Sequence, residues 1–228
     1  MATRPMAGNV SSAKAALRRA SGARRRALEH EAVMRLGGEV QKRLAALLSF
    51  GPRITLALYA ASEREVPTRA LFEAARASGS RCVLPRLVEG ARVLSFREIE
   101  SFDALVPAPH FRILEPKADA PEVALGDIDV FLVPGVAFSL DGGRLGRGGG
   151  HYDATLALAR GLRVALAFEC SVVNELPLEP TDVPMDALVT EERAVICRRG
   201  PERSRLGAAD PVALEALLAE LGAKPAKP

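Results

Sequence analysis

Hydrophobic periodicity divides the first part of the chain into helical and strand-like segments. Apolar residues recur at roughly helical spacing between residues 12 and 49, with interruptions at Ser21-Gly22 and Gly37-Gly38. This segment therefore predicts two or three helical pieces. The apolar run at 53–59 predicts a buried strand, and residues 66–79 predict a helix that begins near a proline and ends at a glycine.

Strand patterns dominate the rest of the chain. The run at 128–138 is the strongest of them, and the proline-containing segment 101–127 predicts a long surface connection. Further strands are predicted at 81–85, 92–96, 162–168, 186–190 and 194–198, and further helices at 151–160 and 211–221. Strands that alternate with helices are typical of an α/β fold, so we expect a layered sandwich with a central, largely parallel sheet flanked by helices.

The length of the chain favours a single domain. Its 228 residues suffice for one substantial core, and no internal repeat is visible. We expect one α/β domain over 12–198, preceded by a flexible N-terminus at 1–11. Residues 199–228 are expected to form a C-terminal extension with one possible helix and a disordered tail, since the chain ends in the polar, proline-containing sequence GAKPAKP.

Composition favours a globular protein that works in water. Hydrophobic residues make up 48% of the chain and charged residues 26%, and no run of about 18 uncharged apolar residues appears. Membrane insertion is therefore not expected. Cys82, Cys170 and Cys197 are widely spaced and form no CxxC pair, which argues against a disulfide framework and against a zinc site. A reducing, cytoplasmic location fits this cysteine usage.

Basic residues are concentrated near the N-terminus, although the net charge is only +3. The basic residues that precede the first acidic one, Glu29, are Arg4, Lys14, Arg18, Arg19, Arg24, Arg25 and Arg26. This asymmetry allows an organelle presequence, a nucleic-acid patch or the solvated face of a helix. Aromatic residues do not interleave the charges as they do in single-strand binding sites, so no nucleic-acid partner is expected.

A glycine-rich stretch at 142–153, GGRLGRGGGHYD, carries the clearest chemical signal. It lies between a predicted strand and a predicted helix, where free backbone N–H groups can bind a phosphate. The stretch matches neither the Walker A sequence nor the GxGxxG pattern. Arg144 and Arg147 can pair bidentately with phosphate oxygens, and Asp153 can hold a divalent cation. The alternative is a flexible connection in which Asp153 caps the helix.

The longer stretch VPGVAFSLDGGRLGRGGGHYDATL, residues 133–156, resembles the signature of the 5-formyltetrahydrofolate cyclo-ligase family. That signature runs Pro-Gly-x-Ala-Phe, then Gly-x-Arg-Leu-Gly, then Gly-x-Gly-Tyr-Tyr-Asp. Shorter segments agree in order with other family elements: KAALR (14–18), EVPT (65–68), VLPR (83–86), LEP (114–116) and LPLEPTDVPMDALVTEE (176–192). The resemblance therefore covers about residues 12–193.

The resemblance implies a fold of the kind shared with sugar-phosphate isomerases and CoA transferases. It also implies ATP- and Mg²⁺-dependent cyclisation of 5-formyltetrahydrofolate to 5,10-methenyltetrahydrofolate, with release of ADP and phosphate. In that reaction the formyl oxygen receives the γ-phosphoryl group, N10 closes on the activated carbon, and phosphate leaves. Such chemistry needs phosphate and metal ligands rather than a strong nucleophile, and the sequence shows no Ser-His-Asp or Cys-His set.

The resemblance also implies a role for individual residues. The residues assigned to ATP binding are Lys14, Arg18, Arg144, Gly146, Arg147, Gly148, Gly149, Gly150 and His151. The catalytic set is Arg144, Arg147, Tyr152 and Asp153; folate is assigned to Glu65 and Tyr152, and Mg²⁺ to Asp153 and Asp186. His151 stands where family members usually carry an aromatic residue, most often tyrosine. Because family members begin with this N-terminal helix, a presequence is no longer expected.

Each assignment has an alternative. Lys14 and Arg18 could be solvated, Glu65 could be an acid at a helix start, and Asp182 and Asp186 could be turn residues. Tyr152 could belong to the core, and His151 could be a surface ring. Two other functions stay open: a regulatory module that binds a nucleotide without turnover, and a sugar-phosphate isomerase, since fold alone does not fix function. We expect a monomer whose partners are ATP and 5-formyltetrahydrofolate.

Overall fold

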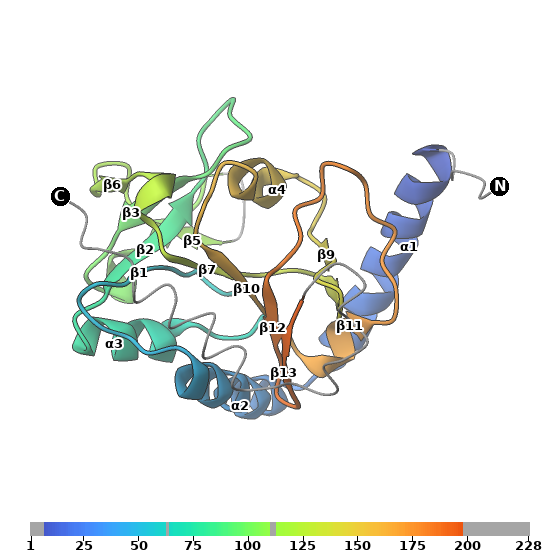
Figure 1. Cartoon of the computed structure of the whole chain (residues 1–228), viewed down its shortest axis with the longest axis horizontal. Coiled ribbons are helices and arrows are strands. Elements are labelled where there is room, and N and C mark those ends of the chain that lie inside the picture. Colours follow the sequence, from blue (N-terminus) through green and yellow to red (C-terminus); the bar gives the residue numbers. More distant parts are fainter. Residues whose placement is uncertain (1–6, 63, 110–112, 198–228) are drawn as a thin grey trace.

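The computed structural model describes residues 7–62, 64–109 and 113–197 (Figure 1). The α-helices are α1 (Ala7–Arg26), α2 (His30–Leu47), α3 (Arg69–Ala77) and α4 (His151–Leu156). The strands are β1 (Thr55–Ala57), β2 (Arg81–Arg86), β3 (Ser95–Glu98), β4 (Val106–Pro107), β5 (Leu114–Glu115), β6 (Glu122–Val123), β7 (Val130–Val133), β8 (Ala137–Ser139), β9 (Arg144–Leu145), β10 (Leu162–Leu166), β11 (Val172–Val173), β12 (Ala187–Val189) and β13 (Ala194–Ile196). Short 3₁₀ turns lie at η1 (Phe102–Ala104), η2 (Leu125–Asp127) and η3 (Glu169–Ser171).

A central sheet with strand order β13-β12-β10-β7-β1-β2-β3-β6 forms the middle layer. The five strands from β12 to β2 are parallel to one another, and the outer strands β13, β3 and β6 pair antiparallel. In Figure 1, α2 and α3 lie below this sheet and α4 lies above it. The predicted α/β fold with a central, largely parallel sheet is confirmed.

Two apolar layers cover the two faces of the sheet. On one face, Val40 and Leu44 of α2 and Phe72 of α3 pack with the strand residues Leu56 and Leu132. On the other face, residues from β3, β7, β8 and α4 form a second cluster: Phe96, Phe131, Phe138 and Leu156. The central strand β7 is buried along its whole length, as expected for a parallel strand that is covered on both sides.

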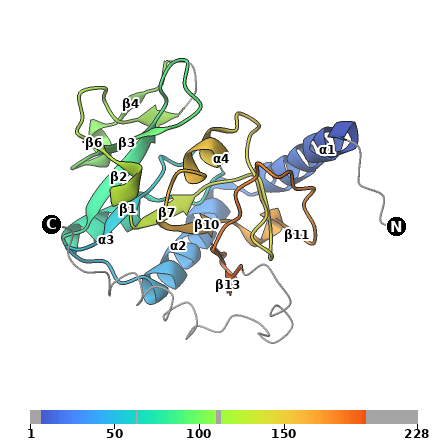
Figure 2. The same ribbon diagram turned by 45° about the horizontal axis from the view of Figure 1, so that its top comes forward.

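The strand predicted at 128–138 is in fact two strands. β7 ends at Val133 and β8 begins at Ala137, because Pro134 has no N–H to continue the ladder and the chain turns out of the central sheet. β8 then pairs with β9 and β11 in a separate three-stranded sheet, which lies beside α1 (Figure 1, Figure 2). The sequence pattern did not reveal β9, which lies within the glycine-rich stretch.

The helix breaks predicted at Ser21-Gly22 and Gly37-Gly38 are wrong. α1 and α2 run through both sites, and the chain turns between them, after Arg26. α1 also begins at Ala7, so residues 7–11, which were expected to be flexible, are helical. Gly37 explains one of these errors, because a Cβ built on it would lie 2.5 Å from Cδ of Pro67. This glycine is needed for close packing rather than for a turn.

The connection at 101–127 is more ordered than its prolines indicated. β6 pairs with β3 and extends the central sheet, and β4 pairs with β5. The Glu115 side chain is only 2% exposed; it lies 2.6 Å from Arg86 and accepts a hydrogen bond from the Leu87 N–H. The segment therefore contributes a buried ion pair, which its composition does not reveal.

The other predicted strands and helices are confirmed, with ends displaced by a few residues. The helix predicted at 211–221 and the expected extension at 199–228 lie outside the described residues. Within the described ranges, no helix is both long and apolar enough to cross a bilayer.

Gly37 and Gly38 offer a matched test of packing against helix propensity. We expect Gly37→Ala to lower the free energy of unfolding by about 1–3 kcal/mol, because its methyl group would overlap Pro67. A Cβ on Gly38 meets no atom within 4 Å, so Gly38→Ala should raise stability by about 0.5–1 kcal/mol. Urea denaturation of the two variants measures both effects, and a stabilised Gly37→Ala protein would contradict the packing argument.

Candidate active site

The glycine loop, residues 146–150, connects β9 to α4. Gly148 and Gly150 have φ values of 110° and 71°, a backbone region that other residues adopt only with strain. The loop ends where α4 begins, so that Arg144 precedes it, Arg147 lies within it, and Tyr152 and Asp153 directly follow. The structure therefore brings most of the predicted site residues to one place.

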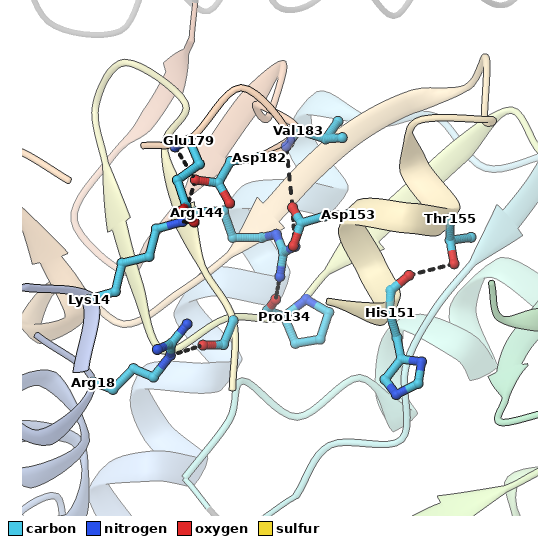
Figure 3. A network of polar contacts seen from close by, with 11 residues as sticks. Lys14, Arg18, Pro134, Arg144, His151, Asp153, Thr155, Glu179, Asp182 and Val183 are labelled. Carbon is cyan, nitrogen blue, oxygen red and sulfur yellow. Dashed lines mark hydrogen bonds and ion pairs between the residues drawn. The ribbon is translucent and has the colours of Figure 1, made fainter. Parts of the chain in front are cut away.

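Arg144 and Asp153 form a buried ion pair across this loop (Figure 3). Nη2 of Arg144 lies 2.9 Å from Oδ1 of Asp153, and the Arg144 side chain is only 2% exposed. Oδ1 also accepts a hydrogen bond of 3.2 Å from the Val183 N–H. Nε of Arg144 is buried and has no hydrogen-bond partner among the described residues. A buried donor of this kind is normally satisfied, so it fits a ligand oxygen.

Tyr152 provides a second unsatisfied group. Its hydroxyl is buried and also lacks a hydrogen-bond partner within the described part of the chain. Burial raises the pKa of this phenol, and the charge of Glu65 raises it further while that of Arg144 lowers it. The hydroxyl therefore stays protonated and can donate a hydrogen bond. The Arg144 guanidinium lies 5.5 Å from the centre of the ring.

α1 presents two basic residues to the same region. Lys14 and Arg18 are four residues apart and thus share one helix face. Nε of Arg18 donates to the carbonyl of Gly146, at 2.9 Å, and so contacts the glycine loop directly. Nζ of Lys14 lies 2.6 Å from a carboxylate oxygen of Glu179 and 2.6 Å from one of Asp182 (Figure 3). The alternative interpretation was that both cations are only solvated. The structure instead gives each of them protein partners.

The two carboxylates determine the charge state of Lys14. Burial lowers the pKa of this amine, but the hydrogen bonds and charges of Asp182 and Glu179 outweigh burial, so the pKa is raised. Lys14 is therefore a firmly charged ammonium. The backbone N–H of Glu179 donates to Asp182, which confirms that Asp182 also acts as a turn residue.

Glu65 follows β1 and pairs with the glycine loop. Its Oε1 lies 2.8 Å from Nη2 of Arg147, while its Oε2 accepts a hydrogen bond of 2.9 Å from the Ser62 N–H. The Arg147 side chain is 57% exposed, whereas that of Glu65 is only 9% exposed. Glu65 also lines a small hollow with both apolar and polar walls: Arg25, Arg64, Val66, Pro134, Gly135, Phe138, Leu166, Ala167, Phe168 and Ser171.

Two predicted site residues, His151 and Asp186, make no contact with the polar network around Arg144 and Asp153 among the contacts that the structure describes. Nδ1 of His151 lies 3.1 Å from the carbonyl of Arg92, and its ring extends away from Asp153 (Figure 3). Both carboxylate oxygens of Asp186 accept hydrogen bonds from Arg163 at the start of β10. Asp186 therefore holds a strand end. Asp182, in contrast, contacts Lys14, and the residue after it, Val183, donates its N–H to Asp153.

Sequence reasoning missed Arg25, Glu179 and Asp182 as members of the site. Arg25 follows Lys14 by three helical turns, so helical periodicity alone could have placed it on the same face. Its guanidinium donates to the carbonyl of Gly135, at 2.7 Å, at the edge of the hollow. Glu179 and Asp182 lie in an irregular segment without periodicity. No sequence pattern therefore predicted that their carboxylates contact Lys14.

The donors for a metal ion are few. Within the described ranges, no three His, Cys, Asp or Glu side chains form a cluster that could hold a metal ion. Mg²⁺, however, is usually held by one or two carboxylates together with phosphate oxygens and water. Asp153 and Asp182 supply hard oxygen donors of this type beside the glycine loop.

Sequence and structure comparisons both relate this chain to known proteins. The sequence model of the 5-formyltetrahydrofolate cyclo-ligase family matches residues 10–191. The 5-formyltetrahydrofolate cyclo-ligase of Escherichia coli K12 is 34% identical over 175 residues, which cover 75% of this chain and 96% of that protein.

Solved structures give the same result. The NMR structure of 5,10-methenyltetrahydrofolate synthetase from Aquifex aeolicus has a TM-score of 0.71 at 34% identity and covers 82% of this chain and 94% of its own. The synthetase from Mycoplasma pneumoniae has a TM-score of 0.64 at 26% identity, covering 78% and 98%. With a family match over most of its length, this chain belongs to the 5-formyltetrahydrofolate cyclo-ligase family.

Proposed function

We propose that the protein converts 5-formyltetrahydrofolate to 5,10-methenyltetrahydrofolate with consumption of ATP and release of ADP and phosphate. The observation that supports this most directly is the pair of buried, unsatisfied donors that flank the glycine loop, Nε of Arg144 and the hydroxyl of Tyr152. Preorganised donors stabilise developing charge without further reorganisation, which is what phosphoryl transfer requires.

The chemistry explains why the site is rich in cations. A formamide oxygen is a poor leaving group, so phosphorylation by the γ-phosphoryl group must precede ring closure by N10. Arg144, Lys14 and Arg18 carry the positive charge that the phosphates need, and Arg147 is exposed enough to reach a bound nucleotide. Glu65 and Tyr152 lie next to these cations and are assigned to the folate.

Mg²⁺ would supply a counter-charge to the phosphates. Asp153 and Asp182 are the carboxylates that would hold it, because each contacts protein donors through one oxygen, Oδ1 of Asp153 and Oδ2 of Asp182. We therefore assign the second carboxylate to Asp182 in place of Asp186, whose oxygens are occupied by Arg163. For phosphate to reach Lys14, it has to replace Glu179 and Asp182 as the partner of this ammonium.

One assay separates this function from its rivals. Absorbance of the methenyl product should increase only when enzyme, 5-formyltetrahydrofolate, ATP and Mg²⁺ are all present. ATP binding without product would instead indicate a nucleotide-binding module. Turnover of a sugar phosphate without ATP would indicate an isomerase, which needs a positioned carboxylate base.

Arg144→Lys tests the phosphate assignment without removing the positive charge beside Asp153. Lysine cannot form the two-pronged contact of a guanidinium, so we expect turnover to fall by about 10- to 150-fold, corresponding to roughly 1.5–3 kcal/mol. Steady-state kinetics should show the loss in kcat and in KM for ATP, with KM for folate within about twofold. The matched control is Arg160→Lys, at an exposed position after α4. An equal loss for both substrates would argue against a phosphate contact.

Asp182→Asn and Asp186→Asn distinguish the two candidates for the second metal carboxylate. We expect Asp182→Asn to raise the Mg²⁺ concentration needed for half-maximal activity by about tenfold, because an amide lacks the charge that a hard cation prefers. Asp186→Asn should leave this requirement unchanged and only weaken the contact with Arg163. Activity titrations with Mg²⁺ decide between them, and the reverse pattern would restore Asp186 to the metal site.

A further inference from the structure

The ion pair between Glu65 and Arg147 joins the two halves of the site. Arg147 belongs to the glycine loop, which is assigned to ATP, and Glu65 follows β1 and is assigned to folate. Their atoms lie 2.8 Å apart, although the residues are 82 positions apart in sequence. Arg147 also donates to the Ser62 hydroxyl, on the same side as Glu65. In this state the only guanidinium within the glycine loop is directed towards the folate side.

The contacts of Glu65 show that the ion pair with Arg147 limits the access of a ligand to this carboxylate. Its Oε2 is used by the Ser62 N–H and its Oε1 by Arg147, and the side chain is 9% exposed. A folate donor that approaches Oε1 from the direction that Arg147 uses therefore displaces this guanidinium. Arg147 is 57% exposed and is followed by Gly148, so both its side chain and its backbone can turn. The pair consists of one fixed partner and one mobile partner.

We infer that Arg147 exchanges Glu65 for a nucleotide phosphate, and that this exchange couples the binding of ATP to the binding of folate. This inference rests on the proposed function of the site. Whichever ligand arrives first breaks the ion pair, and the second ligand then binds without that cost. By thermodynamic linkage the coupling is reciprocal: each ligand increases the affinity for the other by the same factor.

Arg25 is a second positive charge close enough to Glu65 to interact with it when Arg147 leaves. Arg25 lines the same hollow as Glu65 and is anchored by its hydrogen bond to Gly135. Burial lowers the pKa of this guanidinium and Arg147 lowers it further, whereas the charge of Glu65 raises it. Departure of Arg147 therefore removes a repulsive neighbour from Arg25, and Oε1 of Glu65 becomes available to the ligand.

Calorimetric titration tests the coupling directly. The affinity for 5-formyltetrahydrofolate is measured without nucleotide and with a saturating, non-hydrolysable β,γ-imido analogue of ATP plus Mg²⁺. We expect the analogue to strengthen folate binding at least about fivefold, at the lower end of common allosteric couplings. The reverse titration, of the analogue with and without folate, should give the same factor.

Two variants should change the affinities in opposite directions. Arg147→Gln should bind the analogue more weakly but bind folate, in the absence of nucleotide, as tightly as wild type or more tightly, because no ion pair has to break. Glu65→Gln should bind the analogue more tightly, because Arg147 is released, and bind folate more weakly. In both variants the coupling factor should fall to within twofold of unity. Arg160→Ala, at an exposed arginine outside the site, is the control and should retain the wild-type coupling.

The outcomes separate this inference from the proposed function. Methenyl product in the absorbance assay, together with a wild-type coupling factor within twofold of unity, would overturn the inference alone. An Arg147→Gln protein that binds both ligands more weakly by similar factors would also overturn it, since Arg147 would then support the site without exchanging partners. Absence of both product and folate binding in the wild-type protein would overturn the proposed function itself.

Discussion

The buried pairing of Arg144 with Asp153 is the constraint on which the rest of the site depends. A guanidinium that is 2% exposed cannot remain without a counter-charge, because an unpaired buried charge costs several kcal/mol. The pair therefore fixes β9 against the first turn of α4. Through the Val183 N–H it also holds the segment that precedes β12. The glycine loop is thus held at both ends, and its five residues must bridge a set distance.

A second property of the site is that its cations are neutralised by the protein itself. Lys14 is paired with Glu179 and Asp182, Arg144 with Asp153, and Arg147 with Glu65. A bare anion that replaced these carboxylates would leave them without counter-charges. A magnesium nucleotide brings charges of both signs, so cations and carboxylates can both find new partners. This charge balance favours a metal-bound polyphosphate over a free one.

The sequence predicted the fold, and it singled out most of the residues that the structure brings together in the candidate site, because both depend on local patterns. Buried strands and the amphipathic α2 and α3 follow from periodicity, and the glycine-rich signature identified Arg144, Arg147, Tyr152 and Asp153. The helix breaks were predicted wrongly because a glycine can serve close packing as well as a turn, and the spacing of Gly37 from Pro67 is set by the tertiary structure. The choice between Asp182 and Asp186 likewise depends on which long-range partner reaches each carboxylate, here Lys14 or Arg163.

The continuous α1 has a consequence for how this part of the chain can vary. Lys14, Arg18 and Arg25 lie on one face of a single helix, with a rise of about 1.5 Å per residue and about 100° of rotation between neighbours. A deletion or insertion of one residue between Lys14 and Arg25 would rotate one of these side chains by about 100° relative to the other. The two could then no longer face the site together. The length of this segment is therefore constrained by the positions of these three side chains. Natural variation between Lys14 and Arg25 should occur through substitution, while changes in length should occur before Lys14 or after Arg25.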